Sequence, residues 1–366
     1  MTAETRQKLI DNLLIPFLAV LSGLLLASIF VLMTGNSPIT AYRRLFEAGF
    51  SCGSYSNCAL FTTFQFATPM ILTGLSAVVA FRSGLFSLGQ EGQLMLGGLM
   101  AAWLGYIIHL PPIIHPAFII LVAMLVGGVY GLFPGILKVK LGVNELISTL
   151  VLNNIAVLFV RYLINFPLRA DQSTTAHTRV IDETAKLMTF APNTKWGVGF
   201  ILAILATVLV FIYLWRSAPG YEQRMAGQAP FFARFGGIPS DGAAIRGMFI
   251  SGMLAGLAGA IQVLGVHYRM LDGFSAGLGF DGVTAAILGQ THPIGTAIVA
   301  VFFAGVRMGA QVGLQLALKI PRELGGGVIA LMILFVAADQ FYRNNIDRIS
   351  AFFKRLRGRK SVEEEA

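Results

Sequence analysis

Two stretches of the sequence place a carboxylate among glycines within otherwise apolar surroundings. The first spans residues 84–93, GLFSLGQEGQ, and contains Glu91; the second spans residues 272–283 and contains Asp281. Such groups can hydrogen-bond a solute or hold an ion, and they are costly at the depth of a bilayer unless they line a cavity or face protein. Paired segments interrupted by glycine are typical of substrate sites in transporters. The other interpretation of Glu91 is a solvated carboxylate at a helix start, where the helix dipole favours it.

Polar side chains near these carboxylates give further candidates for contact with a solute. Asn153 and Asn154 lie midway along an apolar run, where a buried amide needs a hydrogen-bonding partner. Bonding to a neighbouring helix and contact with a solute are equally open for both. The candidates for a pathway or gate are Phe86, Ser87, Gln90, Glu91, Gln93, Asn153, Asn154, Phe280 and Asp281.

The sequence gives little support for catalysis. It contains no G-x-x-x-x-G-K-[ST] loop for nucleotide phosphates, and its five histidines show no H-E-x-x-H or similar metal-ligand spacing. We therefore expect no enzyme activity, no metal site and no cofactor in this chain.

The composition places these stretches in a membrane protein. Of the 366 residues, 55% are hydrophobic and only 12% are charged, and the mean hydropathy is +0.73. A soluble domain carries about 25% charged residues. A soluble enzyme, a disordered chain and a nucleic-acid binder are thus excluded, despite the net charge of +9. Because roughly 20 apolar residues cross a bilayer, we expect an all-α polytopic membrane protein with about ten transmembrane helices, some of them broken.

The expected spans follow the runs that lack acidic and basic residues. Pro111, Pro112 and Pro116 divide the run 92–137 into two spans, and His292-Pro293 forms the hinge of a later pair. The spans are expected at residues 13–33, 60–81, two within 92–137, 144–166, 196–215, 247–268, two within 273–319, and 324–342.

The positive charges of short loops predict the orientation. With ten spans, Lys138, Lys140, Arg224 and the basic residues near both ends fall on one side, so both termini are expected in the cytoplasm. Residues 1–343 are expected to form one transmembrane domain with a cytoplasmic loop at 217–243. Residues 344–366 are expected to form a basic cytoplasmic tail that contacts anionic lipid.

The two cysteines, Cys52 and Cys58, fall in the first external loop. In an oxidising compartment they could form a disulfide. Two unpaired small residues at a membrane surface are the other interpretation.

The loop 217–243 contains a short candidate helix at residues 229–235. Pro230 suits its first turn, and Phe231, Phe232 and Phe235 place three aromatic rings in an aqueous loop. Exposed aromatic residues of this kind are typical of a docking surface for a partner protein. An interfacial helix resting on lipid headgroups is the alternative.

Four stretches together resemble the membrane permease subunits of bacterial ABC importers, in the branch shared by ribose-type and branched-chain amino-acid-type systems. The resemblance covers residues 64–338 and is closest to the nucleoside-type permeases. Ser87 stands where that family usually has Asn, and residues 234–237 replace its usual small-aromatic-Ala-Gly run. The four stretches are 84–93 (G-x-F-N-I-G-x-E-G-Q in the family), 142–153 (G-V-N-E-x-I-x-T-L-x-L-N), 224–238 (R-A-x-G-x-N-P-x-A-A-x-x-A-G-I) and 279–293 (G-F-D-G…L-G-x-x-H-P).

The resemblance implies a permease in the bacterial inner membrane that forms the pathway for nucleosides, or a simple sugar, delivered by a periplasmic or lipid-anchored binding protein. It implies a separate ATPase subunit that binds ATP and Mg. A second permease is expected, in a heterodimer or, alternatively, a homodimer. The other function class is an ion-coupled secondary transporter of a small polar solute, with Glu91 and Asp281 as candidate ion ligands. The residues implied in coupling to the ATPase are Gln228, Ala229, Pro230, Phe231, Phe232, Ala233 and Arg234.

Overall fold

The computed structural model describes residues 25–26, 28–29, 31–33, 35–52, 58–170, 175–191, 194–275, 277–319 and 327. These residues are mostly helical and contain no β-strand. Most of the predicted first span at 13–33, the predicted last span at 324–342 and the tail at 344–366 lie outside the described residues. The helices are α3 Pro38–Phe50, α4 Ala59–Arg82, α5 Gln90–Ile107, α6 Ile114–Leu141, α7 Glu145–Asn165, η3 Glu183–Ala185, α8 Val198–Arg216, α9 Ala218–Gln228, α10 Pro230–Phe235, α11 Ser240–Gln262, η4 Val263–His267, α12 Leu278–Leu288, α13 Pro293–Met308 and η5 Gly309–Ala317.

Among the described residues, six helical segments are long and apolar enough to cross a membrane. They are α4, α6, α7, α8, α11 continued by η4, and α13 continued by η5. This confirms the predicted all-α membrane architecture, while the total of about ten spans stays a prediction.

The chain divides into two units, residues 1–48 with 309–366, and residues 49–308. In the first unit, Gly309 and Gly313 of η5 lie directly against the backbone of α3 at Arg44 and Leu45, leaving no room for a Cβ atom. The second unit contains all the predicted site residues.

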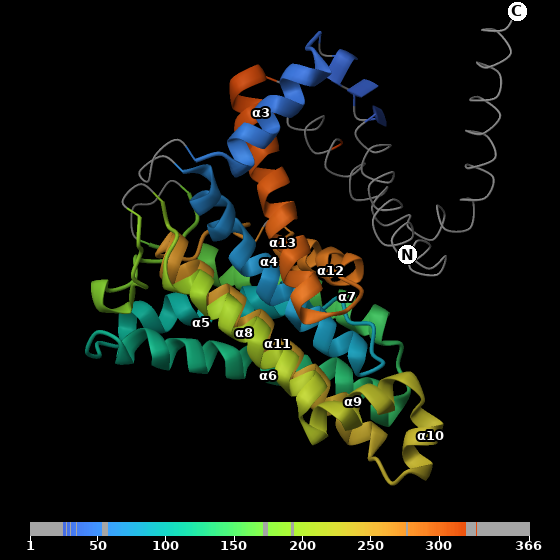
Figure 1. Cartoon of the computed structure of the whole chain (residues 1–366). Helices are drawn as coiled ribbons and strands as arrows, with labels where there is room; N and C mark the ends of the chain where they lie inside the picture. The colour runs from blue at the N-terminus through green and yellow to red at the C-terminus, as the bar shows by residue number, and fades with distance from the viewer. Residues whose placement is uncertain are drawn as a thin grey trace, which may run out of the picture. The chain divides into compact units, whose positions relative to one another are not determined.

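Helix α11 is the central helix of the second unit and packs along α6, α5 and α4 (Figure 1). Its contact with α6 is a glycine ridge, because a Cβ atom on Gly127, Gly252 or Gly256 would overlap the facing backbone. Small residues at such spacing let membrane helices approach closely. Helices α6, α7 and α8 expose many leucine, isoleucine and phenylalanine side chains, as lipid-facing helices do.

Helix α5 begins well inside the bundle. A short turn joins it to α6, and α5 is ten residues shorter than α6. At 1.5 Å per residue, its first turn lies about 15 Å short of the far end of α6. The segment 83–89 joins the end of α4 to this first turn. Pro116, predicted as part of the break, instead lies in the first turn of α6, where proline is tolerated.

Helices α9 and α10 lie together at one end of the bundle, beyond the last residue of α8 (Figure 1). The Ser217 hydroxyl accepts a hydrogen bond from the Gly220 amide at 3.2 Å and caps α9. With α9, α10 and the start of α11, most of the predicted loop 217–243 is helical.

Candidate functional site

Glu91 lies in the first turn of α5 and binds the start of α12. It is 7% exposed. One carboxylate oxygen accepts hydrogen bonds from the Ser275 hydroxyl at 2.5 Å and the Gly277 amide at 3.2 Å, and the other accepts from the Gly279 amide at 2.7 Å. The first amides of a helix have no partner within it, so Glu91 supplies the acceptor that α12 lacks. The carboxylate is therefore buried between helices and not solvated.

A positive charge binds the other end of α12. Arg82, the last residue of α4, donates from Nε to the Thr291 carbonyl at 3.0 Å and from Nη2 to the Gln290 carbonyl at 3.3 Å. These carbonyls directly follow α12, where a cation is favoured by the helix dipole. Opposite charges thus bind the two ends of α12. Its 11 residues extend for about 16 Å, which is too short to cross a bilayer.

Asp281, in the first turn of α12, forms an ion pair with Arg307 of α13. Its neighbour Gly282 lies so close to α4 that a Cβ atom would overlap Thr73. The Thr73 hydroxyl also donates to the Leu278 carbonyl at 3.1 Å. Helix α12 is therefore fixed against α4, α5 and α13 by specific contacts.

Asn153 of α7 binds the segment that leads into α5. Its Oδ1 accepts from the Gly92 amide at 2.7 Å, and its Nδ2 donates to the Leu88 carbonyl. One turn earlier, the Thr149 hydroxyl accepts from the Leu88 amide at 3.2 Å. Of the two roles left open for Asn153, this structure uses its amide for bonding between helices.

Gln90 and Gln93 carry buried amides with unused hydrogen-bonding capacity. They are 0% and 1% exposed, and among the described residues neither side-chain amide atom of Gln90, nor Oε1 of Gln93, has a partner. Ser87 is also fully buried, and its hydroxyl accepts from the Gly89 amide at 3.2 Å. A buried unpaired polar group costs about 1–3 kcal/mol, and a solute, a water molecule or a second conformation can satisfy it.

Phe86, Asn154 and Phe280 are exposed, unlike the residues of this buried cluster. Phe86 is 40% exposed and stacks on Phe81 with ring centroids 4.4 Å apart, and Phe280 is 42% exposed. Asn154 is exposed and donates to the Leu150 carbonyl of its own helix at 3.0 Å. The predicted residues that the structure brings together around the start of α5 are Ser87, Gln90, Glu91, Gln93 and Asn153.

Five residues of the site were not among the predicted candidates: Thr73, Arg82, Thr149, Ser275 and Arg307. Arg307 carried a usable signal, because a basic residue within an apolar span calls for a partner. Ser275 lies within the second glycine-rich stretch, whereas Arg82 marked only the end of a predicted span and Thr149 resembled an ordinary helix residue.

Residues 273–277 read G-x-S-x-G, a pattern that the expectation of no catalysis overlooked. In hydrolases this pattern forms a nucleophile elbow between a strand and a helix. No strand occurs among the described residues, and the Ser275 hydroxyl donates to the carboxylate that binds α12. We therefore assign Ser275 a structural hydrogen bond.

Helix α10 presents its aromatic side chains to the outside of the bundle. Phe231, Phe232 and Phe235 are 78%, 68% and 93% exposed. Ala233 packs inward against α9 and α11, and Arg234 forms an ion pair with an aspartate of α11 at 2.7 Å. The helix is thus attached by one face and leaves three rings available to a partner or a lipid surface.

Cys52 and Cys58 are joined in a disulfide, with their Cα atoms 4.1 Å apart. This separation is within the distance of about 7 Å beyond which two cysteines cannot be bridged. Of the two interpretations that the sequence left open, a disulfide or two unpaired cysteines, the structure has the disulfide.

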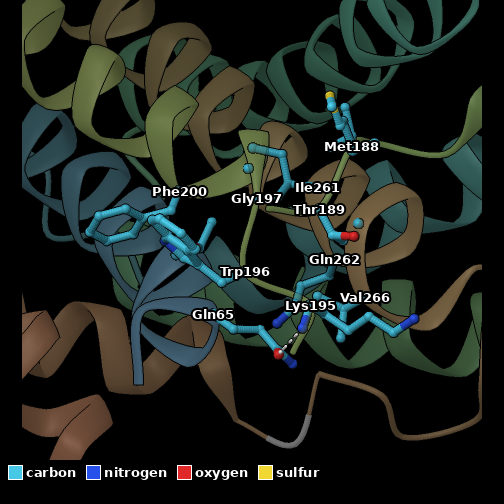
Figure 2. Close-up of a pocket in the computed structure, with 14 residues that line it drawn as sticks. Gln65, Met188, Thr189, Lys195, Trp196, Gly197, Phe200, Ile261, Gln262 and Val266 are labelled. Atoms are coloured by element: carbon cyan, nitrogen blue, oxygen red, sulfur yellow. Dashed lines mark hydrogen bonds between the residues drawn. The ribbon is translucent and has the colours of Figure 1, made fainter. Parts of the chain in front are cut away.

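A small cavity lies between α4, α8 and α11, toward the start of α4 (Figure 2). Its volume of ≈ 20 Å³ is room for about one water molecule. The Gln65 side-chain oxygen accepts from the Lys195 amide at 3.1 Å, as the dashed line in Figure 2 marks. Oε1 of Gln262 and Nε1 of Trp196 are buried without a partner among the described residues. The cavity suits a bound water molecule and not a sugar-sized solute.

Larger hollows on the flanks of the second unit are apolar. One of ≈ 640 Å³ lies beside α6 and α8, and one of ≈ 400 Å³ lies between α5, α6 and α7. Both are lined mainly by aliphatic, proline and aromatic side chains. Such surfaces suit lipid chains or a partner helix better than a polar solute.

Comparison with protein families matches residues 59–337 to the family described as branched-chain amino acid transport system / permease component. The match includes the cluster around Glu91, the short helix α12 and the exposed helix α10. The chain belongs to this permease family. Membership confirms the resemblance found in the sequence and gives the permease a role in transport.

Three relatives match nearly the whole permease. It is 33% identical to the guanosine ABC transporter permease protein NupP of Bacillus subtilis over 92% of this chain and 96% of that protein. It is 31% identical to the nucleoside ABC transporter permease protein NupB of Lactococcus lactis, over 89% and 91% of the two chains. Identity to the glucose ABC transporter permease protein TsgB13 of Haloferax volcanii is 26%, over 90% and 88%. No solved structure matches the permease.

Proposed function

We propose that this chain is the transmembrane permease subunit of an ABC importer and forms the pathway for nucleosides. The observation that carries this proposal is the identity of 33% and 31%, over about nine tenths of the chain, to permeases named for guanosine and for nucleosides. A simple sugar is the second substrate class, because a relative named for glucose matches over a similar length at lower identity.

The buried cluster at the start of α5 contributes to the pathway. A nucleoside carries hydroxyls and a base with hydrogen-bond donors and acceptors, which the unpaired amide of Gln90 and the unpaired side-chain oxygen of Gln93 complement. Glu91 and Asp281 act by positioning α12, a short helix of the kind found beside transport sites. The exposed candidates Phe86, Asn154 and Phe280 line the part of the pathway that a second permease subunit completes.

ATP and Mg bind a separate ATPase subunit, and helix α10 couples the permease to that subunit. Its exposed aromatic residues suit an apolar groove on that subunit. The permease has about ten spans with both termini in the cytoplasm of a bacterium, and residues 217–243 lie on that side of the inner membrane. A second permease, preferably a different chain, completes the membrane core, and a binding protein delivers the solute externally.

Uptake into membrane vesicles tests this function. The permease is co-expressed with its ATPase, a second permease and a binding protein, and uptake of tritiated guanosine is measured. We expect uptake that requires ATP on the ATPase side and persists when proton and sodium gradients are collapsed by ionophores. Uptake that needs an ion gradient and no ATPase would instead assign the chain to the ion-coupled transporters.

Competition then defines the substrate class. Unlabelled uridine and adenosine should reduce guanosine uptake, whereas ribose and glucose at the same concentration should not. Competition by glucose alone would transfer the assignment to the sugar class.

A further inference from the structure

Three side chains connect α9 to the turn that follows α12, at the end of the bundle where α10 lies. The Trp215 ring, near the end of α8, is contacted by two guanidinium groups. The Cζ atoms of Arg82 and Arg224 each lie 5.3 Å from its centroid. The electron-rich ring attracts both cations and so keeps two like charges near each other. Arg224 belongs to α9 and Arg82 to α4, so Trp215 links helices that are far apart in the sequence.

Arg82 continues this connection to the turn after α12. Its guanidinium group donates to the carbonyls of Gln290 and Thr291, as described above. Both of these residues have positive φ angles, 54° and 52°. Side chains other than glycine adopt this backbone only where surrounding contacts stabilise it. The ring of His292, the next residue, also lies 4.9 Å from that of Trp215. The turn therefore depends on Arg82 and Trp215.

Helix α9 is fastened to the end of α4 by direct contacts as well. The buried Gln223 side chain donates to the Val79 carbonyl at 2.9 Å and to the Ser83 hydroxyl at 2.7 Å. Gly227 lies so close to the backbone at residues 82–84 that a Cβ atom would overlap it. A displacement of α9 must consequently move the end of α4, from which Arg82 projects.

We propose that Trp215 and Arg82 are positioning residues that transmit displacement of α9 and α10 to α12. The inference rests on the proposed function, in which α10 receives movement from an ATPase. Helix α12 is the receiving element because Glu91 binds its opposite end, beside the unpaired amide of Gln90 and the unpaired side-chain oxygen of Gln93. Movement of the turn at residues 289–292 thus changes how α12 sits against the buried cluster.

The test compares Trp215→Leu with Trp215→Phe in the complete reconstituted complex. Leucine fills space but has no ring to attract the guanidinium groups, whereas phenylalanine keeps an aromatic face. The measured quantities are copurification of the ATPase, the rate of ATP hydrolysis, and tritiated guanosine uptake. We expect Trp215→Leu to retain the ATPase and hydrolyse ATP at a near-normal rate, while uptake falls at least threefold. The number of ATP molecules hydrolysed per solute should rise accordingly and return toward normal in Trp215→Phe.

Two further variants keep the result interpretable. Phe200→Leu removes a ring from the other end of α8, where it stacks on Phe64, and should leave the ratio of hydrolysis to uptake unchanged. Arg82→Lys keeps the positive charge but cannot reproduce the planar guanidinium contacts with the ring and both carbonyls. It should raise the ratio of ATP hydrolysis to uptake as Trp215→Leu does. If the leucine variant fails to assemble, Arg82→Lys provides the test in its place.

Three outcomes would overturn the inference. They are normal hydrolysis and uptake in both Trp215→Leu and Arg82→Lys, a fall of hydrolysis and uptake by the same factor in both, or loss of the ATPase from both complexes. Failure of the proposed function has a different signature, because the unmodified complex would then show uptake that does not depend on ATP.

Discussion

Glu91 accepts hydrogen bonds from three donors at the start of another helix, so a neutral side chain should weaken the attachment of α12. Glu91→Gln removes the charge and one acceptor oxygen, and hydrogen bonds to charged groups contribute about 1.5–3 kcal/mol each. We expect this variant to assemble normally, to lose about 1–3 kcal/mol of stability by this measure, and to take up solute several-fold more slowly. Vesicle uptake at matched amounts of complex, together with thermal unfolding, measures both effects.

The matched control is Asn165→Ala, which removes an exposed amide bonded within its own helix. It should change neither quantity. If uptake by Glu91→Gln were also normal, the carboxylate would have a structural role only.

Asp281 and Arg307 should behave as a coupled pair. Both side chains are partly buried, and removing one partner leaves the other charge poorly compensated. Each single change is therefore expected to destabilise more than the pair contributes. We expect Asp281→Asn and Arg307→Gln to lower the unfolding temperature separately, and the double variant to lower it by less than their sum. A double-mutant cycle from thermal unfolding gives the coupling, and strictly additive effects would argue against a working ion pair.

At the scale of elements, helix α10 should lose its partner when its rings become charged. Phe231→Asp with Phe232→Asp would place two carboxylates in an apolar groove, where an unpaired charge is strongly disfavoured. The ATPase should no longer copurify, and ATP-dependent uptake should be abolished, while the permease itself remains folded because both rings are exposed. A double variant that copurifies and transports normally would show that the docking surface lies elsewhere.

The glycine contact between α6 and α11 should not tolerate a side chain. Gly256→Leu would force the two helices apart, and overpacking of this kind costs about 1–3 kcal/mol or more. Gly242→Ala, in the first turn of the same helix, meets only ordinary van der Waals contact and serves as the control. Thermal unfolding in detergent should show a lower midpoint for the first variant alone; equal midpoints would mean that the interface can adjust.

Local patterns predicted the elements whose ends are determined locally. Pro230 and the neighbouring aromatic residues predicted α10, and the run without charges predicted α4 to within a residue at each end. Helix α12 was different, because residues 273–319 are largely apolar and its end lies at a turn that Arg82 contacts from 208 positions away. The partners of Glu91 were likewise hidden, since Ser275 lies 184 positions further along the chain. Long-range pairing of this kind leaves no periodic signal in a single sequence.

For the whole molecule, labelling of single cysteines tests the predicted orientation. On a background with serine at positions 52 and 58, cysteines replacing Lys138, Arg224 and Lys354 should react with an impermeant reagent from the cytoplasmic side only. A cysteine replacing Thr174 should react only from outside. Thr174 and Lys354 lie outside the described residues, so these two positions test the topology independently of the structure. Cytoplasmic labelling at position 174 would require a different number of spans.

Arg82 and Glu91 bind opposite ends of α12, yet only a short stretch of chain separates them. The distance between the two charges must therefore match the length of α12. Surface loops usually tolerate insertions and deletions, but one residue added to or removed from 83–89 would put a charge out of reach of its helix end. We expect homologous sequences to keep the number of residues in this segment even where their residue types differ. A change in that number should be inherited only together with a change in the length of α12.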